Sequence, residues 1–271
     1  MDLQQEIIRL RKDGFLYREI AQELSMPKSS VEYRLNRFLG EERWRVLNNS
    51  QEQLILGSLL GDAHLHVKKP RIERNETKTQ YDVVFTQGEK QLEYLLWKHK
   101  ILNSACKVRK IAPSKDGFSK LPWYKFSFSH APFLRRIVPL VLLNGKKKVS
   151  IEWLNSLDEI GLAFWFQDDG HSIMGGRRDK DGKHVQQVVR LATNSFSDEE
   201  MEIIAEYFRT KWEIKCCILH SKGPVLIMNN SNAIRFITLI SPWVFLNYKI
   251  KITGVDYSLI GTKLHLLHPG S

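Results

Sequence analysis

The chain has 271 residues, enough for a sizeable core and for one or two domains. Hydrophobic residues make up 42% and charged residues 26%, which excludes a disordered chain, and the longest apolar runs are far shorter than the roughly 20 residues that cross a bilayer. Three cysteines, two of them adjacent, argue against a disulfide framework and predict an intracellular protein, cytoplasmic in a bacterium or phage or else within an organelle.

The formal net charge is +11. A balance this basic favours a polyanionic partner, most often nucleic acid, although charge alone is equally compatible with a merely soluble basic protein. Residues 1–50 contain nine Lys and Arg against eight Asp and Glu, so nearly all of the excess lies in the larger C-terminal part. We therefore expect the main nucleic-acid surface beyond residue 50.

Residues 1–45 predict a small all-α module of three helices. Apolar residues recur at helical spacing from Leu3 to Leu10, and this first helix stops at Asp13-Gly14. A second helix runs from about Tyr17 to Leu24. The turn Ser25-Met26-Pro27 comes next, and its proline is tolerated at the start of a third helix.

The second and third helices, with the string Y-R-E-I-A-Q-E-L-S-M-P-K-S-S-V-E-Y-R-L, resemble a helix-turn-helix DNA-binding unit. In such units the second helix of the pair enters the major groove with its N-terminal residues leading. The resemblance implies DNA contacts from the polar and basic residues of the third helix: Lys28, Ser29, Ser30, Tyr33, Arg34 and Arg37. The alternative is a small bundle used for packing or protein contact. Residues 40–53 predict a connector, with Asn48-Asn49-Ser50 marking a break.

Two segments beyond the connector are alike. The first is L-I-L-G-S-L-L-G-D-A-H (residues 54–64), and the second is L-A-F-W-F-Q-D-D-G-H (residues 162–171). Each is an apolar helical run that leads to an acid, then a small residue and a histidine. The acids Asp62 and Asp169 are 107 residues apart.

The residues downstream of each segment repeat as well. Alternating strand patterns and an amphipathic helix occur twice in the same order: strands 64–67, 81–87, 107–111 and 123–130 with helix 90–103, then strands 171–174, 187–194, 216–220 and 225–228 with helix 198–211. Each copy ends in a helix and a tail whose first lysines, Lys146 and Lys249, are 103 residues apart. The similar spacings predict two halves, residues 50–150 and 151–260, and a C-terminal tail, residues 261–271.

Residues 54–258 resemble the LAGLIDADG homing endonucleases. L-L-G-D-A-H is similar to the first motif of that family, and W-F-Q-D-D-G, with A-T-N-S-F-S-D-E-E downstream, is similar to the second motif of one subgroup. The resemblance implies an α+β fold: a pseudo-two-fold pair of αββαββα halves with antiparallel, saddle-shaped sheets and the motif helices packed together. Gly57 and Gly61 suit such a helix seam. Phe164 and Asp168 occupy the corresponding positions of the second motif, which predicts a bulkier surface there.

The chemistry of the two acids favours a metal site. An acid at a helix C-terminus faces the negative end of the helix dipole, and two such acids brought together repel each other. A divalent cation removes the conflict, and carboxylate and carbonyl oxygens suit Mg²⁺ or Mn²⁺, which would activate water and stabilise the leaving oxygen on phosphorus. We predict Asp62 and Asp169 as metal ligands, with the carbonyls of Gly61 and Asp168 as secondary ligands. Asp168 is the alternative to Asp169, and Asp168-Asp169-Gly170 taken alone is typical of a simple turn.

The family resemblance also implies basic residues near the scissile phosphates, here Lys146 and Lys249. Neighbours of equal charge make a solvated helix end the alternative: Lys147, Lys148 and Lys251. Gln87 and Asn194 end corresponding strands, and we expect them to hold waters near the metals.

Alternation along the strands predicts which side chains face DNA. Tyr124, Phe126 and Phe128 would pack inward, which leaves their neighbours outward. The predicted groove-facing residues are His64, His66, Lys68, Lys125, Ser127 and Arg190. Basic or glycine-rich loops are expected to reach flanking phosphates: residues 68–79, 112–122 and 175–186, the last with Arg177 and Arg178.

These features predict a site-specific, divalent-metal-dependent endonuclease of homing type that cuts double-stranded DNA at a long asymmetric target. Because one chain carries both halves, we expect a monomer with no obligate protein partner and no membrane association. The helix-turn-helix would lengthen the footprint. The alternatives are a non-cleaving DNA-binding regulator or an intron maturase of the same fold, and an unrelated basic α/β protein with chance motifs. The presence of both acids favours the enzyme.

Overall fold

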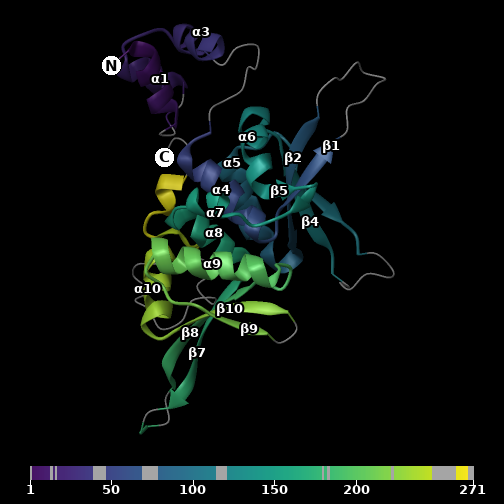
Figure 1. The fold of residues 1–271 in the computed structure, drawn as a ribbon. Coiled ribbons are helices and arrows are strands. Elements are labelled where there is room, and N and C mark those ends of the chain that lie inside the picture. Colours follow the sequence, from purple (N-terminus) through teal and green to yellow (C-terminus); the bar gives the residue numbers. More distant parts are fainter. Residues whose placement is uncertain are drawn as a thin grey trace. The chain divides into compact units, whose positions relative to one another are not determined.

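A computed structural model describes residues 2–12, 15, 17–38, 47–68, 79–113, 121–178, 180–181, 184–220, 223–245 and 261–267 (Figure 1). The chain forms two compact units. The first comprises residues 1–52, 64–136 and 265–271, and the second comprises residues 53–63 and 137–264. In the described part of the chain, no helix is both long enough and apolar enough to cross a membrane.

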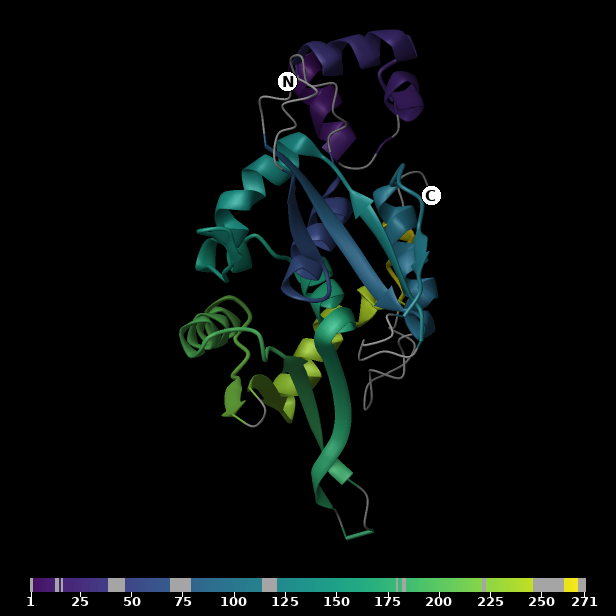
Figure 2. The same ribbon diagram turned by 90° about the vertical axis from the view of Figure 1, so that its right-hand side faces the viewer.

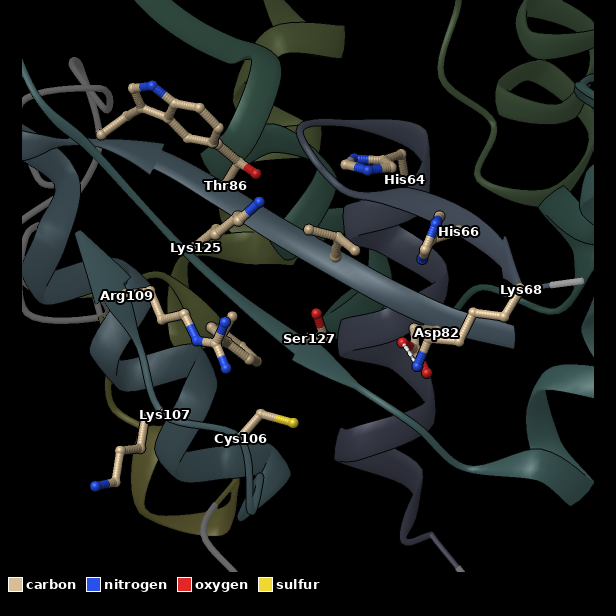
Figure 3. A pocket seen from close by; sticks show the side chains of 13 residues that line it. His64, His66, Lys68, Asp82, Thr86, Cys106, Lys107, Arg109, Lys125 and Ser127 are labelled. Carbon is tan, nitrogen blue, oxygen red and sulfur yellow. Dashed lines mark ion pairs between the residues drawn. The ribbon is translucent and has the colours of Figure 1, made fainter. Parts of the chain in front are cut away.

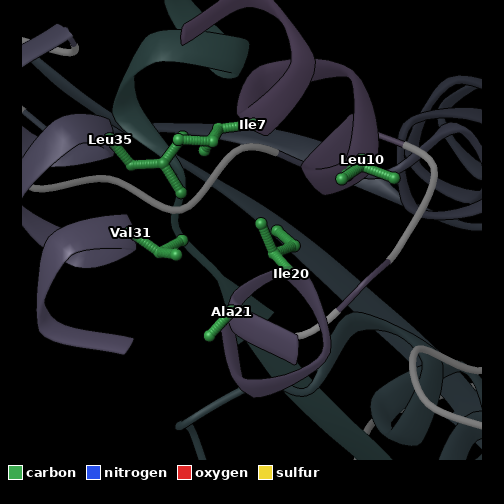
Figure 4. Close-up of a cluster of buried hydrophobic side chains, with 6 residues drawn as sticks. All are labelled: Ile7, Leu10, Ile20, Ala21, Val31 and Leu35. Carbon is green, nitrogen blue, oxygen red and sulfur yellow. The ribbon is translucent and has the colours of Figure 1, made fainter. Parts of the chain in front are cut away.

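The N-terminal module contains the three predicted helices, α1 (Leu3–Lys12), α2 (Tyr17–Glu23) and α3 (Lys28–Phe38). They share a small core of their own, drawn in Figure 4: Ile7, Leu10, Ile20, Ala21, Val31 and Leu35. The turn between α2 and α3 places Ser25 in the left-handed region at φ 48°, and the Met26 N–H donates to the Ala21 carbonyl at 2.9 Å. The predicted turn and helix order are therefore confirmed.

Helix α4 (Asn49–Leu60) begins earlier than the sequence pattern predicts. Asn48 and Gln51 cap each other: the Gln51 N–H donates to Asn48 Oδ1 at 2.9 Å, and the Asn48 N–H donates to Gln51 Oε1 at 3.2 Å. This reciprocal pair fixes the first turn of a helix. The predicted connector at residues 40–53 is thus wrong from Asn49 onward, and residues 39–46 lie outside the described residues.

The first half contains a four-stranded antiparallel sheet with the order β1-β2-β4-β3. Its strands are β1 (His64–Lys68), β2 (Gln80–Gly88), β3 (Arg109–Ile111) and β4 (Trp123–Phe128). A 3₁₀ turn, η2 (Glu89–Gln91), leads into α5 (Leu92–Leu102), which contacts β2 and β4, and α6 (Ala131–Val141) comes after the sheet. The rings of Phe85 and Phe126 stack in this core with centroids 4.8 Å apart.

The second half repeats this arrangement, with the strand order β7-β8-β10-β9. Its strands are β7 (Gly170–Arg178), β8 (His184–Ala192), β9 (Cys217–His220) and β10 (Pro224–Asn229), and its helices are α8 (Glu159–Asp169), α9 (Asp198–Lys211) and α10 (Ser231–Ile240). Figure 2 shows β7 and β8 as a long paired ribbon. The rings of Phe208 on α9 and Phe236 on α10 pack together with centroids 5.8 Å apart. The Phe166 ring on α8 also packs on Phe236, with a centroid distance of 5.8 Å. The equal element order and strand order confirm the predicted repeat and the α+β class.

One predicted loop is largely strand. Within residues 175–186, β7 continues to Arg178 and β8 begins at His184, with an irregular register between Gly175 and Arg178. Arg177 and Arg178 therefore belong to a strand, although the orientation of their side chains lies outside the described part. Residues 69–78 and 114–120 of the other two loops also lie outside the described residues.

Between residues 103 and 245, three short elements were not predicted. A hairpin of β5 (Leu142–Leu143) and β6 (Lys146–Lys147) turns at Asn144 and Gly145, which both have positive φ, 52° and 76°. This is the backbone that a two-residue Asn-Gly hairpin requires. The other two are α7 (Ile151–Asn155) and η3 (Ser241–Trp243).

The described part of the predicted C-terminal tail is hydrogen-bonded to η3. The Gly261 N–H donates to the Ser241 carbonyl at 2.9 Å, and the Lys263 N–H donates to the Pro242 carbonyl at 3.0 Å. A last 3₁₀ turn, η6 (Leu264–Leu267), ends the described part. Residues 246–260, which include Lys249 and Lys251, lie outside the described residues.

Candidate active site

Helices α4 and α8 meet at a seam of small residues, where Gly57 and Gly161 pack directly on each other. A Cβ built on Gly57 would lie 2.1 Å from the Gly161 carbonyl oxygen, and a Cβ built on Gly61 would lie 2.5 Å from Asp168 Cβ. The backbones are therefore in contact at Gly57, and one turn further on the Gly61 backbone faces the Asp168 side chain. The small-residue seam is confirmed, and so is Asp168 as the bulkier partner of Gly61. At Gly57 the predicted bulkier surface is not found, because Gly57 packs against Gly161 and not against Phe164, which is wholly buried.

Gln53 fastens the start of α8 to α4. Its Nε2 donates to the Ser156 carbonyl at 2.8 Å, and its Oε1 accepts the Asp158 N–H at 2.9 Å. Asp158 in turn caps α8 by accepting from Ile160 N at 2.9 Å and from Gly161 N at 3.1 Å. Gln53 and Gly57 on α4 and Gly61 just beyond its end are spaced four residues apart, so one side of this segment fixes both the entry and the crossing of α8.

The two predicted acids lie at the ends of the paired helices. α8 ends at Asp169 itself, and Gly170 is required there, since a Cβ at that position would lie 2.2 Å from Phe166 Cδ2. α4 stops at Leu60, two residues before Asp62, which is exposed in the turn that leads into β1. Helix boundaries of this kind vary by one or two residues, so the prediction of an acid at each helix end holds with this small difference.

Asp168 and Asp169 have different surroundings. Asp168 is 7% exposed and faces the Gly61 backbone, whereas Asp169 is half-buried. A side chain that is packed into the seam has little freedom to reach a ligand, whereas its neighbour keeps access to solvent.

Lys147 is the lysine that the structure places beside the helix ends. Its Nζ donates to the Leu59 carbonyl in the last turn of α4 at 3.0 Å. Burial lowers the pKa of Lys147, while the carboxylates of Asp169, Asp62 and Glu200 act in the opposite direction. Both predicted metal ligands therefore lie within electrostatic reach of one ammonium group.

Lys146, the residue named from the sequence, occupies the adjacent position of β6. Successive side chains on a strand point to opposite faces, so the two lysines cannot share one environment. Both lysines are exposed residues of β6, but Lys147 turns its Nζ to the Leu59 carbonyl, whereas Lys146 pairs with Leu143 next to the turn of the hairpin. Its predicted partner in the second half, Lys249, lies outside the described residues.

The donor set at the helix ends suits a hard cation. It offers the carboxylates of Asp62 and Asp169 and the carbonyls of Gly61 and Asp168, which are all oxygen ligands. Among the described residues, no three His, Cys, Asp or Glu side chains come together closely enough to form a protein-only metal site. Mg²⁺ does not need one, because it is usually held by one or two carboxylates together with waters and substrate phosphates.

Gln87 and Asn194 lie in different settings. Gln87 is 4% exposed and shares the inward face of β2 with Val83 and Phe85. Asn194 is exposed just beyond β8, where its Cβ lies 3.0 Å from the position that a Cβ on Gly223 would take. Their water-holding role stays a prediction.

The outward face of the first sheet is polar and basic (Figure 3). A hollow on it is lined mainly by alternate residues of the strands: His64, His66, Lys68, Asp82, Val84, Thr86, Lys107, Arg109, Trp123, Lys125 and Ser127. Thr86, Lys125 and Arg109 stand in one row across β2, β4 and β3. Asp82 is buried on this face, where it pairs with Lys68 and accepts from the Ser129 hydroxyl. The predicted outward orientation of these side chains is observed, and their role in DNA binding stays a prediction.

In the second sheet, Arg190 stands opposite His171 and Ile227 in the strand register. Its neighbours Val189 and Leu191 are 0% and 1% exposed. Arg190 therefore faces away from the apolar core, as predicted.

The predicted DNA-facing side of α3 is open. Tyr33 is 63% exposed, and Lys28, Ser29 and Arg34 are exposed, while Ser30 is half-buried. Val31 and Leu35, on the other side of α3, are buried in the module core. Arg37 belongs to the same helix, but its side chain is outside the described part.

The repeated fold, the glycine seam and the paired acids define a class of nuclease. A sequence model of the LAGLIDADG DNA endonuclease family matches residues 52–236, and the chain belongs to this family. The N-terminal module lies outside the matched range.

Similar proteins agree with this assignment. "Probable intron-encoded endonuclease 1" of Wickerhamomyces canadensis is 26% identical over 215 residues, which cover 78% of this chain and 87% of that protein. "Protein RecA" of Mycobacterium leprae (strain TN) is 29% identical over 221 residues, which cover 76% of this chain but only 28% of that protein. The solved structure of the homing endonuclease I-WcaI bound to its DNA recognition sequence has the same fold, with a TM-score of 0.62 and 22% identity over 79% of this chain and 91% of that one.

Gly57→Ala tests the seam. The new methyl group would clash with the Gly161 carbonyl, which is backbone and cannot turn aside, so α4 and α8 must separate. We expect a loss of about 1–3 kcal/mol in the free energy of unfolding, measured by urea denaturation. Gly88→Ala is the matched control, since nothing lies within 4 Å of a Cβ there; it should change stability by less than about 0.5 kcal/mol. Equal effects of the two substitutions would contradict the seam.

Proposed function

We propose that this chain is a site-specific, divalent-metal-dependent endonuclease of homing type that hydrolyses phosphodiester bonds of double-stranded DNA at a long asymmetric target. The family membership supports an endonuclease, and the names of the relatives support the homing type. The single observation that carries the proposal is that Asp62 and Asp169 lie at the ends of two helices held together by Gly57 and Gly161, with the Lys147 ammonium bonded to the Leu59 carbonyl at one of these ends.

Mg²⁺ or Mn²⁺, when bound, supplies positive charge for the phosphate oxygens and a reactive water at neutral pH. Asp62 and Asp169 would hold it, with the carbonyls of Gly61 and Asp168 as further ligands. The half-buried setting of Asp169 supports it over Asp168, which is packed against Gly61.

The protein's own groups position and stabilise the phosphate. Lys147 donates one hydrogen bond to the Leu59 carbonyl, and an ammonium has three N–H groups, so two remain for oxygens near the acids. A fixed cation beside the reacting phosphate stabilises the charge that builds up on phosphorus. Lys146 and Lys249 keep a supporting role toward neighbouring phosphates in this proposal.

We assign two surfaces to DNA. The basic face of the first sheet, with His64, His66, Lys68, Lys125 and Ser127, would read base edges, since a ribbon of strands fits the major groove. Arg190 on the second sheet would serve in the same way.

The second surface is α3 of the N-terminal module, whose polar and basic residues would bind duplex outside the cleavage site: Lys28, Ser29, Ser30, Tyr33, Arg34 and Arg37. The helix-turn-helix turn at Ser25 and the charge of the exposed face of α3 support DNA as its partner.

Substituting the acids should separate cleavage from binding. Asp62→Asn and Asp169→Asn keep the side-chain size but remove a negative ligand, so each variant should bind duplex DNA and lose nearly all Mg²⁺-dependent cleavage. Cleavage is measured on a target selected by the wild-type chain from a random-sequence duplex library. Asp198→Asn, which is exposed at the start of α9, serves as control. Full cleavage by both single variants would show that the metal lies elsewhere.

The adjacent lysines provide an internal comparison. Lys147→Ala removes the ammonium beside the acids, and single-turnover cleavage should fall by about a hundredfold or more. Lys146→Ala removes the same charge from the opposite face of β6 and should lower the rate far less. The reverse order of the two effects would restore Lys146 as the catalytic lysine.

The N-terminal module should contribute to affinity without affecting chemistry. Lys28→Ala and Arg34→Ala should each reduce the slope of log K against log salt by about one if each side chain contacts a phosphate. Binding to a long duplex is measured in EDTA by fluorescence anisotropy, and the rate on bound DNA should stay unchanged. Arg9→Ala is the control, because Arg9 is paired with Glu6 on α1. An unchanged slope in both α3 variants would assign α3 to another partner.

A further inference from the structure

The hairpin that carries Lys147 is too short to hold the lysine in place by itself. Its strands share two residue pairs, Leu142–Lys147 and Leu143–Lys146, and the Lys148 N–H closes it by donating to the Val141 carbonyl at 2.9 Å. A single two-stranded hairpin is marginally stable at best in water. Leu143, at the tip, is 54% exposed, so the tip gives little apolar anchorage. The position of the ammonium therefore depends on what holds the base of the hairpin.

Glu200 holds the base. The Val149 N–H, two residues beyond Lys147, donates to Glu200 Oε1 at 2.7 Å. Val149 and Glu200 are 1% and 7% exposed, so this hydrogen bond is screened from water. A charge-assisted hydrogen bond in such a setting is stronger than one between neutral groups and is costly to leave unmade.

The other carboxylate oxygen of Glu200 has a separate role. Oε2 accepts the Ser197 N–H at 2.8 Å, while the Glu200 N–H donates to Ser197 Oγ at 3.3 Å. These two bonds form the capping box at the start of α9, which explains why Ser197 and Glu200 stand three residues apart. A cap needs one oxygen only. The bond from Val149 to Oε1 is a second contact, and it joins the second half of the repeat to the first.

Phe196 adds a contact from the same segment. The Lys147 Nζ lies 5.5 Å from the centroid of the Phe196 ring, and Phe196 is 7% exposed. A cation within about 6 Å of an aromatic face is attracted to it. The Glu200 carboxylate also acts to raise the pKa of Lys147, which places its charge near the ammonium. Phe196 thus contacts Lys147, and Glu200 binds the backbone two residues beyond it.

We propose that Glu200 is a positioning residue for DNA cleavage: through Val149 it fixes the β5–β6 hairpin so that Lys147 lies at the helix ends that carry Asp62 and Asp169. This role rests on the proposed function, in which Lys147 stabilises charge on the phosphate. The second half of the chain therefore sets the place of a lysine that belongs to the first half.

Glu200→Gln tests the proposal, because glutamine has the same size but only one oxygen for two N–H donors. The substrate is the duplex selected by the wild-type chain from a random-sequence library. We expect single-turnover cleavage with Mg²⁺ to fall on the order of tenfold to a hundredfold, with affinity for the same duplex in EDTA nearly unchanged. Glu206→Gln is the matched control, since Glu206 is exposed on the same helix and pairs with Arg209. It should match the wild type in both measurements.

A double substitution separates positioning from a general loss of structure. If Glu200 acts through Lys147, adding Glu200→Gln to Lys147→Ala should leave the cleavage rate of Lys147→Ala unchanged. An equal loss in both backgrounds overturns the proposal, and so does cleavage at the wild-type rate by Glu200→Gln. Wild-type cleavage by Lys147→Ala would instead contradict the proposed function of the lysine.

Phe196→Leu provides a test that leaves the capping box intact. Leucine keeps an apolar side chain at this buried position but removes the ring beside the ammonium. We expect a smaller loss of single-turnover rate, again absent in the Lys147→Ala background, with the melting temperature recorded for each variant. A rate loss that persists without Lys147 would overturn positioning by this segment.

Discussion

The contact of two glycine backbones, Gly57 on α4 and Gly161 on α8, is the constraint on which the site depends. No side chain fits between them, so the separation of the helices is set by backbone atoms, which cannot change rotamer. Buried apolar residues surround the crossing, including Leu54 and Phe164, which are 0% exposed. A close-packed interior of this kind resists sliding. The ends of both helices are thereby held at fixed places, and the acids are held with those ends.

Such an arrangement brings unfavourable charges together. Each helix end presents its last carbonyls and the negative end of a dipole, and each carries a carboxylate close by. The Lys147 ammonium relieves part of this, since it satisfies the Leu59 carbonyl while it lies within reach of both acids. The remaining negative charge would favour a divalent cation at the site. One lysine thus offsets part of the repulsion between the acids in the metal-free protein and would meet the phosphate in the complex.

The sequence predicts the topology better than it predicts the contacts. Strand alternation and the repeat are local patterns, and they placed His64, Lys125 and Arg190 on the correct faces. The sequence favours Lys146 only when the lysine segment is treated as a tail. Asn144-Gly145 is a hairpin signal, however, and predicts a strand over the lysines. Adjacent lysines on a strand point to opposite faces, so Lys146 and Lys147 are not interchangeable. The bonds made by Gln53 to Asp158 and by Glu200 to Val149 join residues 105 and 51 positions apart, and no local pattern contains them.

The seam shows why aligned positions do not identify contact partners. Gly57 aligns with Phe164 in the repeat but packs on Gly161, because two crossing helices pair residues by geometry and not by equivalence. Gly61 is the exception, since its aligned residue, Asp168, is also its neighbour. Where aligned residues are also neighbours, their side chains would occupy the same space. The buried Asp168 side chain fits there only because Gly61 has no side chain. The additional acid of the second motif and the glycine of the first are therefore coupled: Gly61 makes room for Asp168, and Asp169 keeps its access to solvent.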